Sequence, residues 1–172
     1  MKARKIHIVG IYGSGKSTLA KKLGEKLNIK TYDLDEIKYK RKYDQIRTVS
    51  QRKRIVKGIS KKSSWISEGA WLDYALDLYK SADLVVFLKI PKNVLYKRII
   101  FRFFKRKLSG KRYFGNNLKN TGKIMRNVRR YFHSTDYFMT LRSHENYINK
   151  HARNIFVVKN KKDLKKLFGE IS

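Results

Sequence analysis

The chain of 172 residues, about the length of one domain, carries 43 Lys and Arg against 13 Asp and Glu, a formal net charge of +30. Its 41% hydrophobic and 13% aromatic content is too high for a disordered basic tail, and the absence of cysteine excludes disulfide scaffolds, thiol catalysis and Cys-ligated zinc. No apolar run approaches the ~18 residues of a membrane span and no signal peptide is indicated, so we expect a cytoplasmic protein whose partner is anionic: a phosphate-rich ligand, nucleic acid or a membrane face.

Predicted strands and helices alternate from the N-terminus onward. A short β-branched run broken by Gly10 predicts a strand at Lys5–Val9, and leucines spaced four apart predict an amphipathic helix at Lys16–Leu27. The weaker elements expected next are a strand at 31–34, a helix at 50–62, a short strand at 64–67 leading into Glu68, and a helix at 72–80.

The second half continues this alternation. A near-continuous apolar run at 83–90 is typical of a strand buried on both faces of a parallel sheet. Pro91 stands where a helix can begin, and a basic, aromatic helix is expected to run to about Leu108. The remaining expectations are a loop at 109–120, a mainly helical stretch at 123–149, a strand at 154–159 and a helix at 161–168. Five strands separated by helices predict a single α/β domain, residues 1–172, with a doubly wound parallel sheet.

A glycine-rich loop links the first predicted strand to the first predicted helix. Residues 10–17 read Gly-Ile-Tyr-Gly-Ser-Gly-Lys-Ser and fit G-x-x-x-x-G-K-[ST], so their backbone N–H groups can turn inward around phosphate oxygens. Lys16 can reach the β- and γ-phosphates, and the Ser17 hydroxyl can ligate Mg²⁺. The pattern predicts the nucleotide-binding loop of P-loop NTPases, formed by Gly10, Gly13, Ser14, Gly15, Lys16, Ser17 and Thr18.

Five segments, in order along the chain, resemble the P-loop kinases of the adenylate-kinase-like group. They are residues 6–23, 32–37 (Tyr-Asp-Leu-Asp-Glu-Ile), 65–69 (Trp-Ile-Ser-Glu-Gly), 82–88 (Ala-Asp-Leu-Val-Val-Phe-Leu) and 98–106. Within that group the chain is most similar to the small bacterial DNA topology modulation proteins, which themselves resemble nucleoside monophosphate and shikimate kinases. The resemblance implies a three-layer α/β/α sandwich around five parallel strands, ATP and Mg²⁺, a basic lid at about 98–130, and phosphoryl transfer to a small-molecule or nucleotide acceptor.

Acidic side chains follow two of the predicted strands, where a doubly wound sheet places its ligands. The resemblance implies that Asp35 faces the acceptor or the metal; the alternative, for Asp35 or the preceding Asp33, is a cap on the next helix. Glu68 suits Mg²⁺ binding or general-base work, and its alternative is a buried structural partner of Lys16 or of a backbone amide. The resembled nucleotide kinases often have a substrate-binding Arg near this place. Trp71 follows here instead, which weighs against a monophosphate acceptor and leaves its ring able to stack.

Residues 84–135 contain 15 Lys or Arg and no Asp or Glu. Within them Arg98, Arg102 and Arg106 recur every four residues, and such like-charged pairs destabilise a helix by about 0.2–0.5 kcal/mol each unless an anion lies between them. In the kinase interpretation these arginines belong to the lid and face the triphosphate, with Arg98 and Arg102 as the better candidates. The alternative is a solvated basic face.

The sequence supports two functional hypotheses. The first is an ATP-dependent kinase that uses Mg²⁺, with the catalytic residues Lys16, Asp35, Glu68, Arg98 and Arg102. The second is a nucleic-acid-binding protein that uses the P-loop as an ATPase or nucleotide sensor. The net charge favours it, but no recognisable nucleic-acid-binding module is present, and the aromatic residues among the cations of 126–132 have the spacing of a core. A polynucleotide kinase would reconcile the two.

Overall fold

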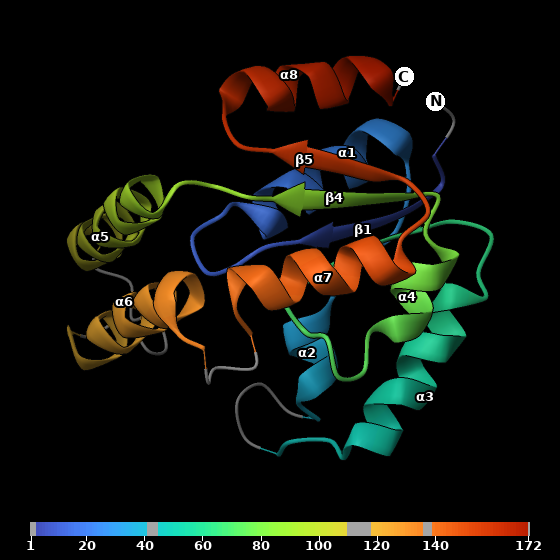
Figure 1. Cartoon of the computed structure of the whole chain (residues 1–172), viewed down its shortest axis with the longest axis horizontal. Coiled ribbons are helices and arrows are strands. Elements are labelled where there is room, and N and C mark those ends of the chain that lie inside the picture. The colour runs from blue at the N-terminus through green and yellow to red at the C-terminus, as the bar shows by residue number, and fades with distance from the viewer. Residues whose placement is uncertain (1–2, 41–44, 110–117, 136–138, 172) are drawn as a thin grey trace.

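The computed structural model describes residues 3–40, 45–109, 118–135 and 139–171 (Figure 1). Its centre is a five-stranded parallel sheet with the strand order β2-β3-β1-β4-β5. The strands are β1 Lys5–Val9, β2 Thr31–Asp33, β3 Trp65–Gly69, β4 Leu84–Leu88 and β5 Ile155–Val158. The helices are α1 Lys16–Leu27, α2 Leu34–Lys38, α3 Val49–Ser60, α4 Leu76–Ser81, α5 Lys92–Leu108, α6 Leu118–His133, α7 Leu141–His151 and α8 Lys161–Glu170. The predicted α/β architecture with five parallel strands is confirmed.

Helices cover both faces of the sheet and form two hydrophobic cores. Side chains of α1, α5, α6 and α8 fill one core, and those of α2, α3, α4 and α7 fill the other (Figure 1). Side chains of β4 alternate between the two: Val86 lies in the first core, and Val85 and Phe87 lie in the second. Because β4 is buried on both faces, its sequence is continuously apolar, as the run at 83–90 predicted.

The helix expected at 72–80 begins later, at Leu76. The residues before it make long-range hydrogen bonds to the start of α2: Trp71 Nε1 donates to Asp35 Oδ1 at 2.7 Å, and Tyr74 Oη donates to the Leu34 carbonyl at 2.8 Å. These tertiary contacts hold the segment after β3 in an irregular path. Helical spacing of apolar residues was therefore a misleading signal here.

Three further boundaries differ from the expectations. The second strand ends at Asp33, which caps α2, so residue 34 is helical rather than extended. Of the loop expected at 109–120, residues 118–120 belong to α6, and residues 110–117 lie outside the described residues. The stretch at 123–149 forms two helices, because Thr140 begins α7 with a capping box to Ser143. The break lets α6 pack on α5 while α7 packs on α4.

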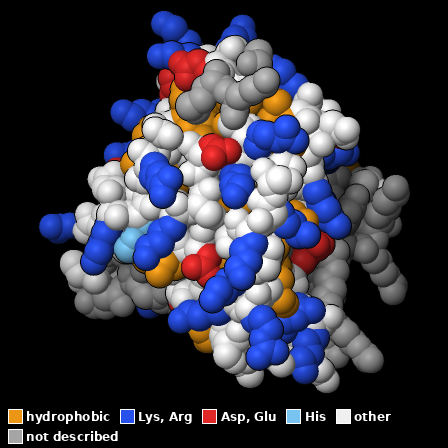
Figure 2. Space-filling view, turned by 90° about the vertical axis from the view of Figure 1, so that its right-hand side faces the viewer, with side chains coloured by type: hydrophobic (Ala, Val, Ile, Leu, Met, Phe, Trp, Pro, Cys, Tyr) orange, Lys and Arg blue, Asp and Glu red, His pale blue; other side chains and the backbone are white. Residues whose placement is uncertain are grey.

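The excess positive charge is spread over the face shown in Figure 2. On the face shown in Figure 2, Lys and Arg side chains cover much of the surface with few Asp or Glu between them. Tyr131 is buried in the core and Phe132 packs against it, which confirms the core interpretation of these aromatic residues. In the described part of the chain, no helix is both long enough and apolar enough to cross a membrane.

His7 gives the fold a pH-dependent stability. Its ring lies in the middle of β1, fully buried, with Nδ1 2.8 Å from Ser67 Oγ and the ring edge against Tyr79. Burial lowers the pKa of His7 from 6.5 to about 3. Between these pH values, His7 therefore binds a proton in the unfolded chain and stays neutral in the folded chain. As the pH falls below 6.5, we expect His7 to lower the free energy of unfolding by up to about 1.4 kcal/mol per pH unit.

The measurement is urea denaturation of the wild type and of His7→Gln between pH 7 and pH 4.5. The variant should show a flatter dependence of the free energy of unfolding on pH, whatever its stability at pH 7. His133→Gln, a matched change at an exposed histidine, should keep the wild-type slope. Equal slopes for His7→Gln and the wild type would contradict a neutral, buried His7.

Candidate functional site

The glycine-rich loop turns between β1 and α1, as its pattern predicts. Gly13 and Gly15 have φ angles of 79° and 99°, in the left-handed region that favours glycine. A Cβ on Gly13 would also lie 3.1 Å from Ile99 Cγ1 of α5. A larger residue at position 13 would therefore meet both backbone strain and a steric conflict. The glycines let the loop pass closely under α5.

The N-terminus of α1 is open to an anion. Gly15 precedes the helix, no side chain caps its first N–H groups, and its first turn contains no acidic residue. Among the described residues, the partial positive charge of the helix end therefore meets no capping side chain and no acidic residue of its own first turn. The Lys16 side chain, only 13% exposed, adds a full positive charge at the same place. This arrangement suits a phosphate group.

Glu68 at the end of β3 lies directly beside the loop, since β3 pairs with β1. Ser17 Oγ donates a hydrogen bond of 2.5 Å to Glu68 Oε1, and Lys16 Nζ lies 4.0 Å from Glu68 Oε2. Burial raises the pKa of the Glu68 carboxyl, although Lys16 and the Ser17 hydroxyl act in the opposite direction. Glu68 is thus a buried partner of Lys16, as one hypothesis held, and its oxygens also adjoin the predicted Mg²⁺ ligand Ser17.

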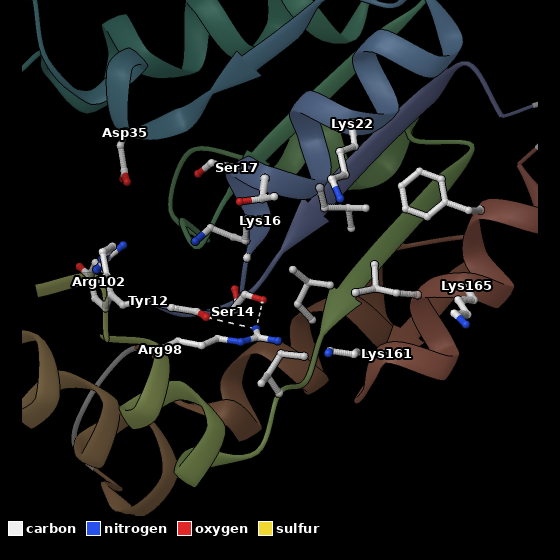
Figure 3. Close-up of a pocket in the computed structure, with 18 of the residues that line it drawn as sticks. Tyr12, Ser14, Lys16, Ser17, Lys22, Asp35, Arg98, Arg102, Lys161 and Lys165 are labelled. Atoms are coloured by element: carbon white, nitrogen blue, oxygen red, sulfur yellow. Dashed lines mark hydrogen bonds between the residues drawn. The ribbon is translucent and has the colours of Figure 1, made fainter. Parts of the chain in front are cut away.

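The aspartates at the end of β2 and at the start of α2 have different environments. Asp33 is the N-cap of α2, because its Oδ1 accepts a hydrogen bond of 2.7 Å from the backbone N–H of Asp35. Burial raises the pKa of the Asp33 carboxyl. Asp35 lies in the first turn of α2, is exposed, and accepts the hydrogen bond from Trp71 with one carboxylate oxygen. The capping alternative therefore describes Asp33, and the Asp35 side chain, although exposed, points into the cavity (Figure 3).

The three arginines of α5 face the loop. Arg98 Nη1 donates to the carbonyl oxygens of Ser14 at 2.9 Å and Gly13 at 3.4 Å (Figure 3). Arg102 and Arg106 line the same cavity. Burial lowers the pKa of Arg102, and the neighbouring charge of Arg106 lowers it further. Cations that oppose one another in this way favour an anion between them.

A single cavity of about 1000 Å³ brings most of the predicted residues together. It is lined by Gly13 to Thr18 of the loop, by Asp35 and by the three arginines, whereas Gly10 lies behind the loop against Leu88. In Figure 3, Asp35 stands at the opposite end of the cavity from α8. Sequence reasoning missed the lining residues at that end, which are Lys22, Lys161, Leu164, Lys165 and Phe168. No motif marks the residues of α8, because this helix is distant from the loop in the sequence and comes close to it only in the folded chain.

Ser17 and Glu68 have the oxygen atoms that Mg²⁺ prefers. Within the described residues, no group of three or more His, Cys, Asp and Glu side chains could hold a metal ion. Such a site fits an ion that takes one or two protein oxygens and completes its octahedron with water and nucleotide phosphate, as Mg²⁺ commonly does.

Three curated proteins match a little over half of this sequence, two of which are described below, and no family model matches it. An uncharacterised protein of Bacillus subtilis (strain 168), YqaC, is 33% identical over 104 residues, which cover 60% of this chain and 58% of that protein. The shikimate kinase of Aquifex aeolicus (strain VF5) is 33% identical over 108 residues, which cover 55% of this chain and 64% of the kinase. The chain therefore spans less than two thirds of the length of these relatives.

Solved structures resemble the chain over nearly its whole length. The shikimate kinase of Bacteroides thetaiotaomicron has a TM-score of 0.61 at 15% identity, with 98% of both chains covered. The shikimate kinase of Acinetobacter baumannii, solved in complex with shikimate, has a TM-score of 0.55 at 16% identity, with 97% of this chain and 94% of the kinase covered. This chain has the P-loop α/β fold of the shikimate kinases.

Proposed function

We propose that this protein is an ATP-dependent kinase that transfers the γ-phosphoryl group of ATP to a hydroxyl group of a small acceptor. The observation that carries the proposal is the one cavity in which the open N-terminus of α1, Lys16 and the arginines of α5 face Asp35. Phosphoryl transfer depends chiefly on positioning and on charge stabilisation, and these groups supply both. The similarity to shikimate kinases supports the same reaction class.

The donor half of the reaction belongs to the loop and α5. The loop N–H groups bind the phosphates, and Lys16 stabilises the charge that develops on the transferred group. Arg98 and Arg102 approach the triphosphate from the other side and displace water from it. Mg²⁺ supplies charge neutralisation on the phosphates when bound, and Ser17 with Glu68 or Asp35 would hold it.

The acceptor half belongs to Asp35. Its second carboxylate oxygen orients the acceptor hydroxyl and takes its proton as the oxygen attacks the γ-phosphorus and ADP departs. The Trp71 hydrogen bond fixes the Asp35 rotamer, so this oxygen points in a set direction. Glu68 keeps Lys16 and Ser17 in place.

The direct test measures ADP formation with ATP, Mg²⁺ and a set of hydroxyl acceptors: nucleosides, nucleotides, sugars, and shikimate, the compound in the relatives' names. The expected result is turnover that depends on one acceptor class and is lost in Lys16→Ala. A chain that binds no ATP and gives no acceptor-dependent ADP would contradict the proposal.

Arg98→Ala tests the arginine contacts with the loop. The variant loses hydrogen bonds between a charged donor and the loop carbonyls, and a cation beside the triphosphate. Because charge-assisted hydrogen bonds contribute about 1.5–3 kcal/mol, we expect kcat/KM for ATP to fall about 10- to 100-fold. Lys97→Ala, an exposed cation one residue earlier, is the matched control and should keep the wild-type value. Equal losses in both variants would point to a general effect of net charge.

The described helices and strands share the two cores of one sheet, which supports a single domain over residues 1–172, with the basic helix α5 lining the cavity and α6 packed on α5. Kinship with the DNA topology modulation proteins stays a prediction. None of the relatives named above has a nucleic-acid-binding description, and the cations in Figure 2 are spread rather than gathered in one patch. The nucleic-acid alternative therefore gains no support from them.

A further inference from the structure

Beside Asp35, two aromatic rings are stacked between two cations. Lys38 Nζ lies 4.0 Å from the centroid of the Trp71 ring, and Trp71 stacks on Tyr74 with 6.0 Å between ring centroids. The guanidinium carbon of Arg52 lies 4.8 Å from the centroid of the Tyr74 ring. This aromatic stack, formed by Lys38, Trp71, Tyr74 and Arg52, joins α2, the segment after β3 and α3.

Carboxylates of the chain itself hold the stack. Trp71 Nε1 donates to Asp35, and Arg52 Nη1 lies 3.4 Å from Asp73 Oδ2. The Arg52 side chain is only 10% exposed, and its Nε is buried. Since Lys38 lies over an indole ring and Arg52 over a phenol ring, each cation is already engaged within the protein. The indole face that the sequence left open for a ligand ring is the face that Lys38 covers.

The charge around the proposed acceptor differs from that of the rest of the molecule. Of the 11 acidic residues that the structure describes (the 13 of the chain less Asp44 and Asp136), five lie on or beside β2, α2 and the end of β3: Asp33, Asp35, Glu36, Glu68 and Asp73. Lys38 and Arg52 balance two of them. The cations that line the cavity outside the loop come from α1, α5 and α8: in Figure 3, Lys22, Lys161 and Lys165 lie away from Asp35, whereas Arg102 stands on the same side as Asp35. The α8 end of the cavity is lined by cations alone among the described charged residues, whereas carboxylates accompany the cations at the Asp35 end.

We propose that the acceptor is an uncharged polyhydroxyl compound, such as a sugar, a polyol or a nucleoside, and not a carboxylic acid or a phosphate ester. The inference rests on the proposed kinase function. An acidic acceptor would have to displace Asp73 from Arg52 or approach Asp35 against like charge, and both are unfavourable. A neutral hydroxyl compound needs only hydrogen bonds with the carboxylate oxygens and the backbone at this place.

Matched pairs of neutral and acidic compounds test the inference. The pairs are glucose with glucuronate, adenosine with AMP, and methyl shikimate with shikimate, each assayed for ADP formation with ATP and Mg²⁺. Binding is followed in parallel by quenching of tryptophan fluorescence, assigned to Trp71 by its loss in Trp71→Phe. We expect the neutral member of at least one pair to give a kcat/KM about tenfold or more above that of its acid.

Asp73→Asn tests the cause of this selectivity. The change frees Arg52 for a carboxylate of the ligand, so the preference for the neutral member should fall about fivefold, the size of a partly exposed ion pair. Asp77→Asn makes the same charge change on α4, near Tyr147, and should leave the ratio unchanged. Thermal denaturation of both variants checks that the fold is retained.

The outcomes separate the two proposals. If the acids are the better substrates for ADP formation, the kinase function stands and the neutral acceptor is wrong. If the acids bind more tightly, as followed by Trp71 quenching, and no ADP forms, both are wrong. If neutral compounds quench Trp71 saturably but no ADP forms, the neutral acceptor stands and the kinase function is wrong. If no compound binds or reacts, both are wrong.

Discussion

Lys16→Ala should abolish most ATP-dependent turnover while leaving the fold intact. The Lys16 ammonium lies at the start of α1, largely buried and 4.0 Å from Glu68, where it faces the phosphates in the proposed complex. Removal of one preorganised charge donor from a transition state costs about 10²- to 10³-fold in kcat. We expect a loss of at least this size in ADP formation, measured at saturating ATP and acceptor.

Lys21→Ala is the matched control for this prediction. Lys21 lies on the outer face of the same helix, is 79% exposed, and pairs with Glu25 one turn later. The control should keep the wild-type kcat and KM. A Lys16→Ala variant with unchanged turnover would exclude the P-loop as the phosphate site and with it the proposed reaction.

Asp35→Asn should reduce kcat strongly with little effect on the KM for ATP. The amide oxygen of Asn can still accept the hydrogen bond from Trp71, so the local structure is kept. The amide cannot accept the proton of the acceptor hydroxyl, and general-base catalysis contributes about 10²- to 10⁴-fold. We expect a decrease in kcat of at least about 100-fold, measured by ADP formation at saturating ATP.

Glu36→Gln provides the comparison. This exposed residue follows Asp35 in the first turn of α2 and undergoes the same loss of one negative charge. A large effect in Asp35→Asn and a small one in Glu36→Gln would assign the effect to the position of the Asp35 carboxylate. Similar, modest losses in both would indicate that only the local negative charge matters.

The phosphate site could be predicted because its signal is local. Its residues are consecutive, and the positive φ angles of Gly13 and Gly15 follow from a pattern that only glycine satisfies without strain. The buried strand at Leu84–Leu88 was equally clear, because a strand covered on both faces must be apolar throughout. In both places the sequence and the tertiary environment require the same residues.

The acceptor end could not be predicted to the same depth. The predicted start of α4 was wrong because Trp71 and Tyr74 form hydrogen bonds with α2, which lies 36 to 40 residues earlier in the chain. The pairing of Arg52 with Asp73 and the place of α8 beside the loop have no sequence pattern. Propensity and spacing describe neighbours along the chain, and these contacts join distant segments.

The sequence by itself determined a glycine-rich loop between the first strand and helix, five strands in a parallel α/β fold, and the carboxylates and arginines that the fold brings to that loop. These features follow from spacing along a single element or turn. Only the tertiary structure decided the strand order β2-β3-β1-β4-β5, the pairing of Glu68 with both Lys16 and Ser17, and the engagement of Lys38 and Arg52 beside Asp35. Parallel strands bring residues distant in the chain to one edge of the sheet, and the charge balance at that edge is fixed only once they meet.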